Sequence, residues 1–140
     1  MGSKIKILLV DDNHTFLTSV RNFLSLVPDI EVVAEAADGA QALIQAAKHR
    51  PDLVLMDIAM PGMSGLEAAS AMNSFARPPH IVFLTMHDDA YYRDAARELG
   101  AMGFVGKSEF VVELIPLIAS LVSSLALPTA SAQEVVRAAH

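Results

Sequence analysis

Five residues with chemically useful side chains stand at or just after the end of an apolar run in this sequence: Asp11, Asp12, Asp57, Thr85 and Lys107. The run before Asp57, Leu53–Met56, has no polar alternation, which is typical of a strand buried on both faces. An ionised carboxylate at the end of such a strand is costly to desolvate unless a positive or hydrogen-bonding group meets it. The position of Asp57 therefore indicates a reaction site.

The elements that would position these residues alternate between strand and helix patterns. We expect strands over residues 5–10, 30–36, 53–56, 81–84 and 104–105. We expect helices over residues 16–27, from the capping pair Asp38 and Gln41 to His49, from the capping box Ser64–Glu67 to a point before Pro78, over 90–99, and over much of 110–125. This alternation predicts a doubly wound α/β fold, with a five-stranded parallel sheet covered by helices on both faces.

In such a sheet the carboxyl ends of the strands meet at one edge, which gathers three carboxylates, a hydroxyl and an ammonium. Two unit charges ~4 Å apart repel by roughly 4 kcal/mol at an effective dielectric near 20, so the acids favour a bound cation. Ligands that are all oxygen suit Mg²⁺, with Mn²⁺ as the alternative, better than zinc. A carboxylate oxygen could then attack a phosphoryl group while Lys107 and Thr85 stabilise its oxygens. The expected product is an aspartyl phosphate.

The composition excludes several other kinds of chemistry. The absence of cysteine excludes disulfides, thiolate metal sites and thiol catalysis. The net charge of −6 argues against binding nucleic acid without a further domain. No signal peptide is apparent, and the apolar stretch 114–127 is interrupted by Pro116 and serines and is too short to span a bilayer. We therefore expect a single-domain cytoplasmic protein without membrane contact.

Four motifs in order give the chain its resemblance to a known family: "LLVDDN", "LVLMDIAMPGMSG", "FLTMHDD" and "GFVGKSE". Over about residues 4–125 the sequence resembles the receiver domains of two-component response regulators. Within that family it is most similar to the NarL/FixJ group, which usually carries a LuxR-type helix-turn-helix after a linker. The resemblance implies the flavodoxin-like strand order 2-1-3-4-5.

The resemblance also implies a role for each acid. Asp57 would accept the phosphoryl group from the phosphohistidine of a sensor histidine kinase and would be a metal ligand. Asp12 would bind Mg²⁺ directly and Asp11 largely through water, and the backbone carbonyl of Ala59 would be a further ligand. Such a domain catalyses its own phosphorylation and slow dephosphorylation, so we do not class it as a conventional enzyme.

The remaining implied roles concern the switch. Thr85 and Lys107 would hold the phosphoryl oxygens, and Phe104 occupies the switch-aromatic position, where its rotamer would report a movement of Thr85. The family's usual output face is formed by the fourth helix, the fifth strand and the fifth helix, and phosphorylation often promotes a homodimer there. Control of transcription would require a DNA-binding domain absent from this chain. We expect residues 1–126 to form the receiver domain and residues 127–140 a linker or C-terminal tail.

Two rival functions stay open at this point. The first is a phosphorylation-independent interaction module that keeps the receiver fold. The second is a haloacid-dehalogenase-type phosphatase, whose signature requires an acid two residues after the nucleophile, where this chain has Ala59.

Some positions depart from the family pattern or allow two structures. Ser108 follows Lys107 where a proline with a cis bond is frequent, so the geometry of that bond is open. Pro116 implies that the last helix either starts late or is kinked. For Asn13 we predict a helix cap, and for the pair Asp88–Asp89 we predict a favourable position at a helix N-terminus.

Overall fold

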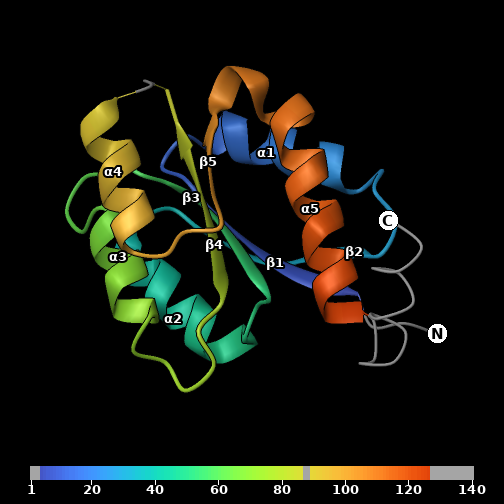
Figure 1. The fold of residues 1–140 in the computed structure, drawn as a ribbon, viewed down its shortest axis with the longest axis horizontal. Coiled ribbons are helices and arrows are strands. Elements are labelled where there is room, and N and C mark those ends of the chain that lie inside the picture. The colour runs from blue at the N-terminus through green and yellow to red at the C-terminus, as the bar shows by residue number, and fades with distance from the viewer. Residues whose placement is uncertain (1–3, 87–88, 127–140) are drawn as a thin grey trace, which may run out of the picture.

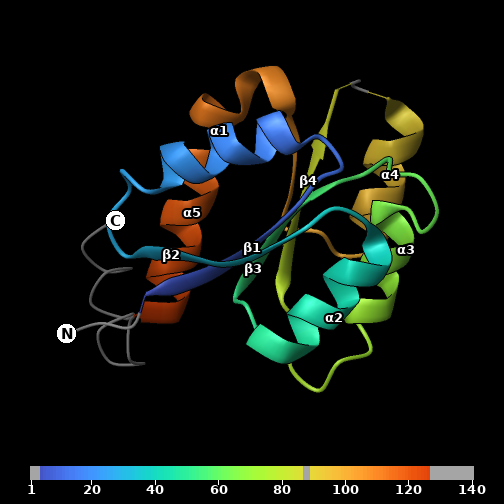
Figure 2. The ribbon, with the colours of Figure 1, turned by 180° about the vertical axis from the view of Figure 1, so that it is seen from behind.

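A five-stranded, all-parallel sheet forms the centre of the molecule, with strand order β2-β1-β3-β4-β5. It is seen in a computed structural model that describes residues 4–86 and 89–126. Helices α1 and α5 cover one face of the sheet, and α2, α3 and α4 cover the other (Figures 1 and 2). The predicted fold class and strand order are therefore confirmed.

The elements follow the predicted alternation. The strands are β1 Ile5–Val10, β2 Ile30–Ala36, β3 Leu53–Asp57, β4 His80–Thr85 and β5 Gly103–Gly106. The helices are α1 His14–Leu24, α2 Gly39–His49, α3 Gly65–Met72, α4 Ala90–Glu98 and α5 Phe110–Ala126, with a 3₁₀ turn at Lys107–Glu109.

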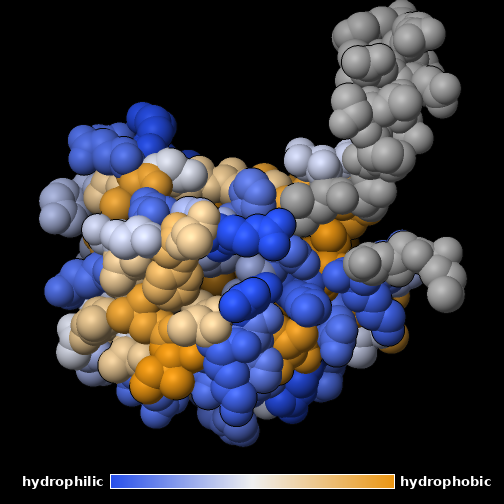
Figure 3. Space-filling view, turned by 90° about the horizontal axis from the view of Figure 1, so that it is seen from below, coloured by the Kyte–Doolittle hydropathy of each residue, from blue (hydrophilic) through white to orange (hydrophobic). Residues whose placement is uncertain are grey.

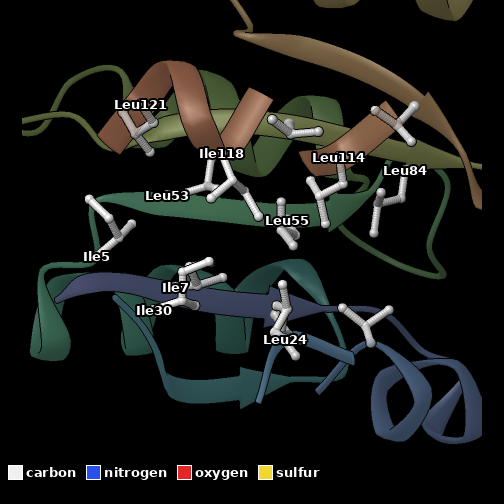
Figure 4. Close-up of a cluster of buried hydrophobic side chains, with 14 of the residues drawn as sticks. Ile5, Ile7, Leu24, Ile30, Leu53, Leu55, Leu84, Leu114, Ile118 and Leu121 are labelled. Atoms are coloured by element: carbon white, nitrogen blue, oxygen red, sulfur yellow. The ribbon is translucent and has the colours of Figure 1, made fainter. Parts of the chain in front are cut away.

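Alternation along the strands divides the core into two layers. Ile7 and Leu9 of β1 join the layer under α1 and α5, whereas Leu8 and Val10 join the layer under α2, α3 and α4. In the first layer, side chains of α5 point toward those of β3 (Figure 4). Burial on both faces explains why the central strands β3 and β4 read as nearly continuous apolar runs.

Side-chain caps begin the helices where the sequence predicts them. The Asn13 side chain accepts from Phe16 N at 3.1 Å, and the Asp38 side chain accepts from Gln41 N at 2.8 Å. Ser64 and Glu67 form the predicted capping box. The Asp89 side chain accepts from Tyr91 N at 2.8 Å, while Asp88 lies outside the described residues. Each cap supplies an acceptor for an N–H group that has no partner within its helix.

The sequence left two alternatives for helix α5, a late start near Pro116 or a kink, and the structure excludes the late start. The helix begins at Phe110, so the late start is wrong and Pro116 lies inside the helix. Proline there removes the hydrogen bond to the carbonyl of Val112. The side chains of Val112 and Pro116 are both exposed. Water on that side of the helix can therefore donate a hydrogen bond to the carbonyl of Val112. None of the described residues has a cis peptide bond, so the Lys107–Ser108 bond is trans.

The described chain starts and finishes at the end of the sheet opposite the carboxyl ends of the strands (Figure 1). Hydrophobic and hydrophilic side chains lie side by side on that end of the molecule (Figure 3). Residues 127–140, for which we predict a linker or tail, lie outside the described residues. No helix within the described ranges has both the length and the apolar character needed to cross a membrane.

Candidate functional site

The carboxyl edge of the sheet collects the residues that the sequence analysis singled out. Asp57 is the last residue of β3 and pairs in register with Leu84, one residue before the end of β4. Thr85 ends β4 and pairs with Gly106, directly before Lys107. Parallel pairing with this register therefore brings residues that are far apart in the sequence to one level of the sheet.

Three carboxylates form the centre of the site. One side-chain oxygen from each of Asp11, Asp12 and Asp57 lies within 4.8 Å of the other two. Asp11 and Asp57 are buried, with 1% and 7% of their surface exposed, whereas Asp12 is exposed. The cluster thus has two acids held inside the protein and one at its mouth.

Backbone N–H groups orient the two buried acids. Asn13 N donates to Asp11 Oδ1 at 2.8 Å, and Ala59 N donates to Asp57 Oδ1 at 3.1 Å.

Gly65, the first residue of α3, is required for the close approach of α3 to the end of β3. A Cβ atom on Gly65 would lie 2.2 Å from the backbone carbonyl oxygen of Asp57, so only glycine lets α3 approach the end of β3.

Lys107 supplies the positive charge that a buried carboxylate at the end of β3 requires. Its Nζ atom lies 2.6 Å from Asp11 Oδ2 and donates to Asp57 Oδ2 at 3.2 Å. Only 7% of the lysine side chain is exposed. The same Nζ lies 4.8 Å from the centroid of the Phe16 ring.

The pKa shifts of the pair have different dominant causes. Burial raises the pKa of Asp57 above its usual value, because desolvation outweighs the stabilisation from the Ala59 N–H and the Lys107 charge. Burial also disfavours the charged form of Lys107, but the contacts with Asp11 and Asp57 outweigh it, so the pKa of Lys107 is raised. The lysine therefore stays charged at neutral pH, and its closer contact is with Asp11.

The acidic cluster has the donor set of a site for a hard divalent cation. Carboxylate oxygens suit Mg²⁺ or Mn²⁺. Asp11 Oδ2 is buried and accepts no hydrogen bond of good geometry, since its contact with Lys107 is an ion pair without the directionality of a hydrogen bond. A buried carboxylate oxygen that accepts no hydrogen bond can also bind a cation, so the three carboxylates are suitable ligands for a metal ion.

Thr85 and Phe104, the predicted switch residues, lie on neighbouring strands. Thr85 is buried at the end of β4, and Phe104 is partly buried on β5. The guanidinium carbon of Arg93, on α4, lies 4.8 Å from the centroid of the Phe104 ring. Met86, directly after Thr85, is 73% exposed.

Sequence reasoning missed one residue that contacts the site. In the sequence Phe16 is the first residue of the apolar pattern that predicts the helix over residues 16–27, and that pattern gives it no role at the site. In the structure its ring lies beside the Lys107 ammonium. The available signal was its position in the first turn of a helix that begins at the carboxyl edge of the sheet, right after Asp12 and the Asn13 cap.

Comparison with known proteins identifies the family of this chain. A family model described as the response regulator receiver domain matches residues 7–119. The transcriptional regulatory protein NarL of Mycobacterium tuberculosis is 35% identical over 115 residues, which cover 82% of this chain and 53% of that protein. A protein-glutamate methylesterase/protein-glutamine glutaminase of Nocardioides is 42% identical over 108 residues, covering 76% of this chain and 28% of that protein. The chain spans about half the length of the first curated relatives it matches.

Solved structures give the same result. The signal receiver domain of NarL from Mycobacterium tuberculosis has a TM-score of 0.78 and 34% identity, and the match covers 84% of this chain and 95% of that one. A LuxR-family two-component response regulator from Aurantimonas has a TM-score of 0.80 and 31% identity, with 94% of both chains covered. This chain therefore belongs to the family of response regulator receiver domains, and it is a receiver domain of the kind found in LuxR-family two-component regulators.

Proposed function

We propose that this protein is a phosphorylation-controlled receiver that takes a phosphoryl group from the phosphohistidine of a sensor histidine kinase onto Asp57. The observation that carries the proposal is the contact of Asp57 Oδ2 with Lys107 Nζ at 3.2 Å, inside a cluster of three carboxylates. A carboxylate nucleophile beside a buried cation and a cation-binding group of acids is an arrangement suited to phosphoryl transfer.

The transfer exchanges one bond to phosphorus for another. The P–N bond to the kinase imidazole breaks as an O–P bond to a side-chain oxygen of Asp57 forms. The imidazole nitrogen keeps the electron pair of the broken bond and takes up a proton. In the later hydrolysis, water attacks phosphorus, inorganic phosphate leaves, and the carboxylate of Asp57 is restored.

The other residues of the site would stabilise charge on the phosphoryl oxygens. Lys107 would contact one oxygen as an ammonium donor, and the hydroxyl of Thr85 would donate to another. The ligands of Mg²⁺ or Mn²⁺ would be Asp12 directly, Asp11 largely through water, Asp57 and the Ala59 carbonyl. The bound cation would offset the negative charge of the acidic cluster and of the phosphoryl group.

We further propose that the output is control of transcription. In support, the relatives that this chain matches include regulators named as transcriptional, among them LiaR of Bacillus subtilis. The net charge of −6 makes DNA binding by this domain itself unfavourable, so a separate DNA-binding domain would be needed. Residues 127–140 would link that domain to the receiver, residues 1–126. Phosphorylation would shift Thr85 and Phe104 and favour a homodimer through the surface of α4, β5 and α5, in the cytoplasm where the kinase donates its phosphoryl group.

Incubation with acetyl phosphate and Mg²⁺, followed by intact-mass measurement, tests the proposal. We expect the parent protein to gain the mass of one phosphoryl group and Asp57→Asn to gain none. Asp94→Asn is the matched control, because Asp94 is an exposed acid on α4 away from the cluster and its variant should be phosphorylated normally. No mass gain in the parent protein would favour the interaction-module alternative, and a gain that persists in Asp57→Asn would mean that another residue is phosphorylated.

A further inference from the structure

The Lys107 ammonium is held from two chemically different sides. Asp11 Oδ2 and Asp57 Oδ2 lie on one side, at 2.6 and 3.2 Å from Nζ. The Phe16 ring lies on another, with its centroid 4.8 Å from Nζ, a distance at which a cation is attracted by the ring face. Because 93% of the lysine side chain is removed from solvent, this attraction is screened less than at an open surface.

The orientation of the Phe16 ring is set by its neighbours. The Asn13 cap fixes the backbone of Phe16 in the first turn of α1. Its ring then meets Phe110, the first residue of α5, edge to face at a centroid distance of 5.5 Å and an angle of 73°. Phe110 in turn meets Phe23 of α1 at 5.6 Å and 89°. The Asn13 cap and the contact with Phe110 therefore hold the Phe16 ring beside the lysine.

An aromatic ring suits this place because it attracts the ammonium without accepting a strong hydrogen bond. Lysine has three N–H donors on a flexible four-carbon stem, so its position depends on the surrounding groups. A further carboxylate beside Nζ would compete for these donors and neutralise the charge. The Phe16 ring restricts the ammonium while leaving its charge to the ion pair with Asp11 and its N–H donors to Asp57 and an incoming phosphoryl oxygen.

We propose that Phe16 is a positioning residue, which holds the Lys107 ammonium where it stabilises the phosphoryl group as that group is transferred to Asp57. The inference rests on the proposed function, since the role it describes is in the phosphorylation of Asp57. It adds a residue of α1 to a site otherwise formed by strand ends and the loops that follow them.

The test compares initial rates of phosphorylation by acetyl phosphate in Mg²⁺, measured by intact mass. Phe16→Leu keeps an apolar side chain but loses the ring, and its rate should fall about threefold to tenfold. Phe16→Tyr keeps a ring and should retain most of the rate. Phe23→Leu is the matched control, because it removes the other edge-to-face contact with Phe110 without touching Lys107. Its rate should equal that of the parent.

Pentafluorophenylalanine at position 16 separates the ring's charge distribution from its packing. This residue keeps the shape of phenylalanine but withdraws electron density from the ring face, so the rate of phosphorylation should fall as it does in Phe16→Leu. The fluorinated protein therefore still tests the inference if Phe16→Leu folds poorly. The same residue at position 23 should have no effect. Calorimetric titration should give the parental Mg²⁺ affinity for each variant, because Phe16 contributes no cation ligand.

Parental rates in both Phe16→Leu and the fluorinated protein would overturn the inference, as would an equal loss in the two variants at position 23. In either case a parent protein that gains the phosphoryl mass at Asp57 would leave the proposed function standing. A parent protein that gains no mass would overturn both.

Discussion

Replacing Lys107 by methionine tests the electrostatic basis of the site. Methionine keeps an unbranched apolar stem and removes the ammonium that lies 2.6 Å from Asp11 Oδ2 and 3.2 Å from Asp57 Oδ2. The variant leaves both buried carboxylates without their cation. We therefore expect the variant to be less stable than the parent at neutral pH in the absence of Mg²⁺.

The structure gives the scale of this loss. At an effective dielectric near 20, the two contacts correspond to gross attractions of roughly 6 and 5 kcal/mol. Desolvation of the ammonium and repulsion between the two acids offset much of that sum. Removing one partner from a buried ion pair costs about 3–5 kcal/mol, which is the net decrease we expect in the free energy of unfolding. With a urea slope of about 2 kcal/mol per molar, the unfolding midpoint should fall by roughly 2 M.

Urea unfolding followed by circular dichroism, without and with excess Mg²⁺, measures the effect. Mg²⁺ should stabilise Lys107→Met more than the parent, because the cation meets two uncompensated carboxylates and no competing ammonium. Arg97→Met is the control, since the Arg97–Asp94 pair is 3.4 Å long and both side chains are largely exposed. That variant should lose less than about 1 kcal/mol.

Two outcomes would refute the reasoning. If Lys107→Met loses no more stability than Arg97→Met, the lysine does not compensate the buried acids. If Mg²⁺ stabilises the parent and Lys107→Met by the same amount, the cation and the ammonium do not act on the same carboxylates.

The remaining predictions concern the acids and the glycine beside them. Because burial raises the pKa of Asp57, its ionised form opposes folding increasingly as the pH rises from the unfolded value of about 3.9 through the folded pKa. Asp57→Asn should therefore be more stable than the parent at neutral pH, and urea unfolding should show the difference vanishing in acid. Gly65→Ala should lower the free energy of unfolding by at least about 2 kcal/mol, since its Cβ would lie 2.2 Å from the Asp57 carbonyl oxygen; an unchanged melting temperature would contradict that clash. Asp12→Ala should weaken calorimetric Mg²⁺ binding more than Asp11→Ala, and equal losses would mean that the ligand assignment is wrong.

Local signals in the sequence predicted most of the fold. The strand β1, Ile5–Val10, and the strand β2, Ile30–Ala36, have the predicted bounds. The first is a mostly apolar run that ends at Asp11 and the second is a partly alternating run that follows Pro28 and Asp29, so local residue patterns set their limits. Strand β5 is longer than predicted, Gly103–Gly106 in place of two residues, because pairing with β4 extends it through glycines that have no strand preference of their own.

The convergence of the candidate site residues at the carboxyl edge of the sheet was also predictable, since parallel strands joined by right-handed crossovers must place their carboxyl ends together. The sequence did not predict which of the acids at that edge is buried and which is exposed. Asp11 and Asp12 are adjacent and chemically identical, yet one is buried against Lys107 and the other is exposed. Neighbouring residues at a strand end point in different directions, and only the packing around them fixes which one faces inward.

The sequence by itself determined which groups the site contains, because residue type, apolar periodicity and helix caps are local properties. Only the tertiary structure decided how those groups meet. The approach of Phe16 to Lys107 depends on the register of β4 with β5 and on the packing of α1 against α5. Contacts between residues so far apart in the chain are set by how whole elements pack, and no local pattern encodes that geometry.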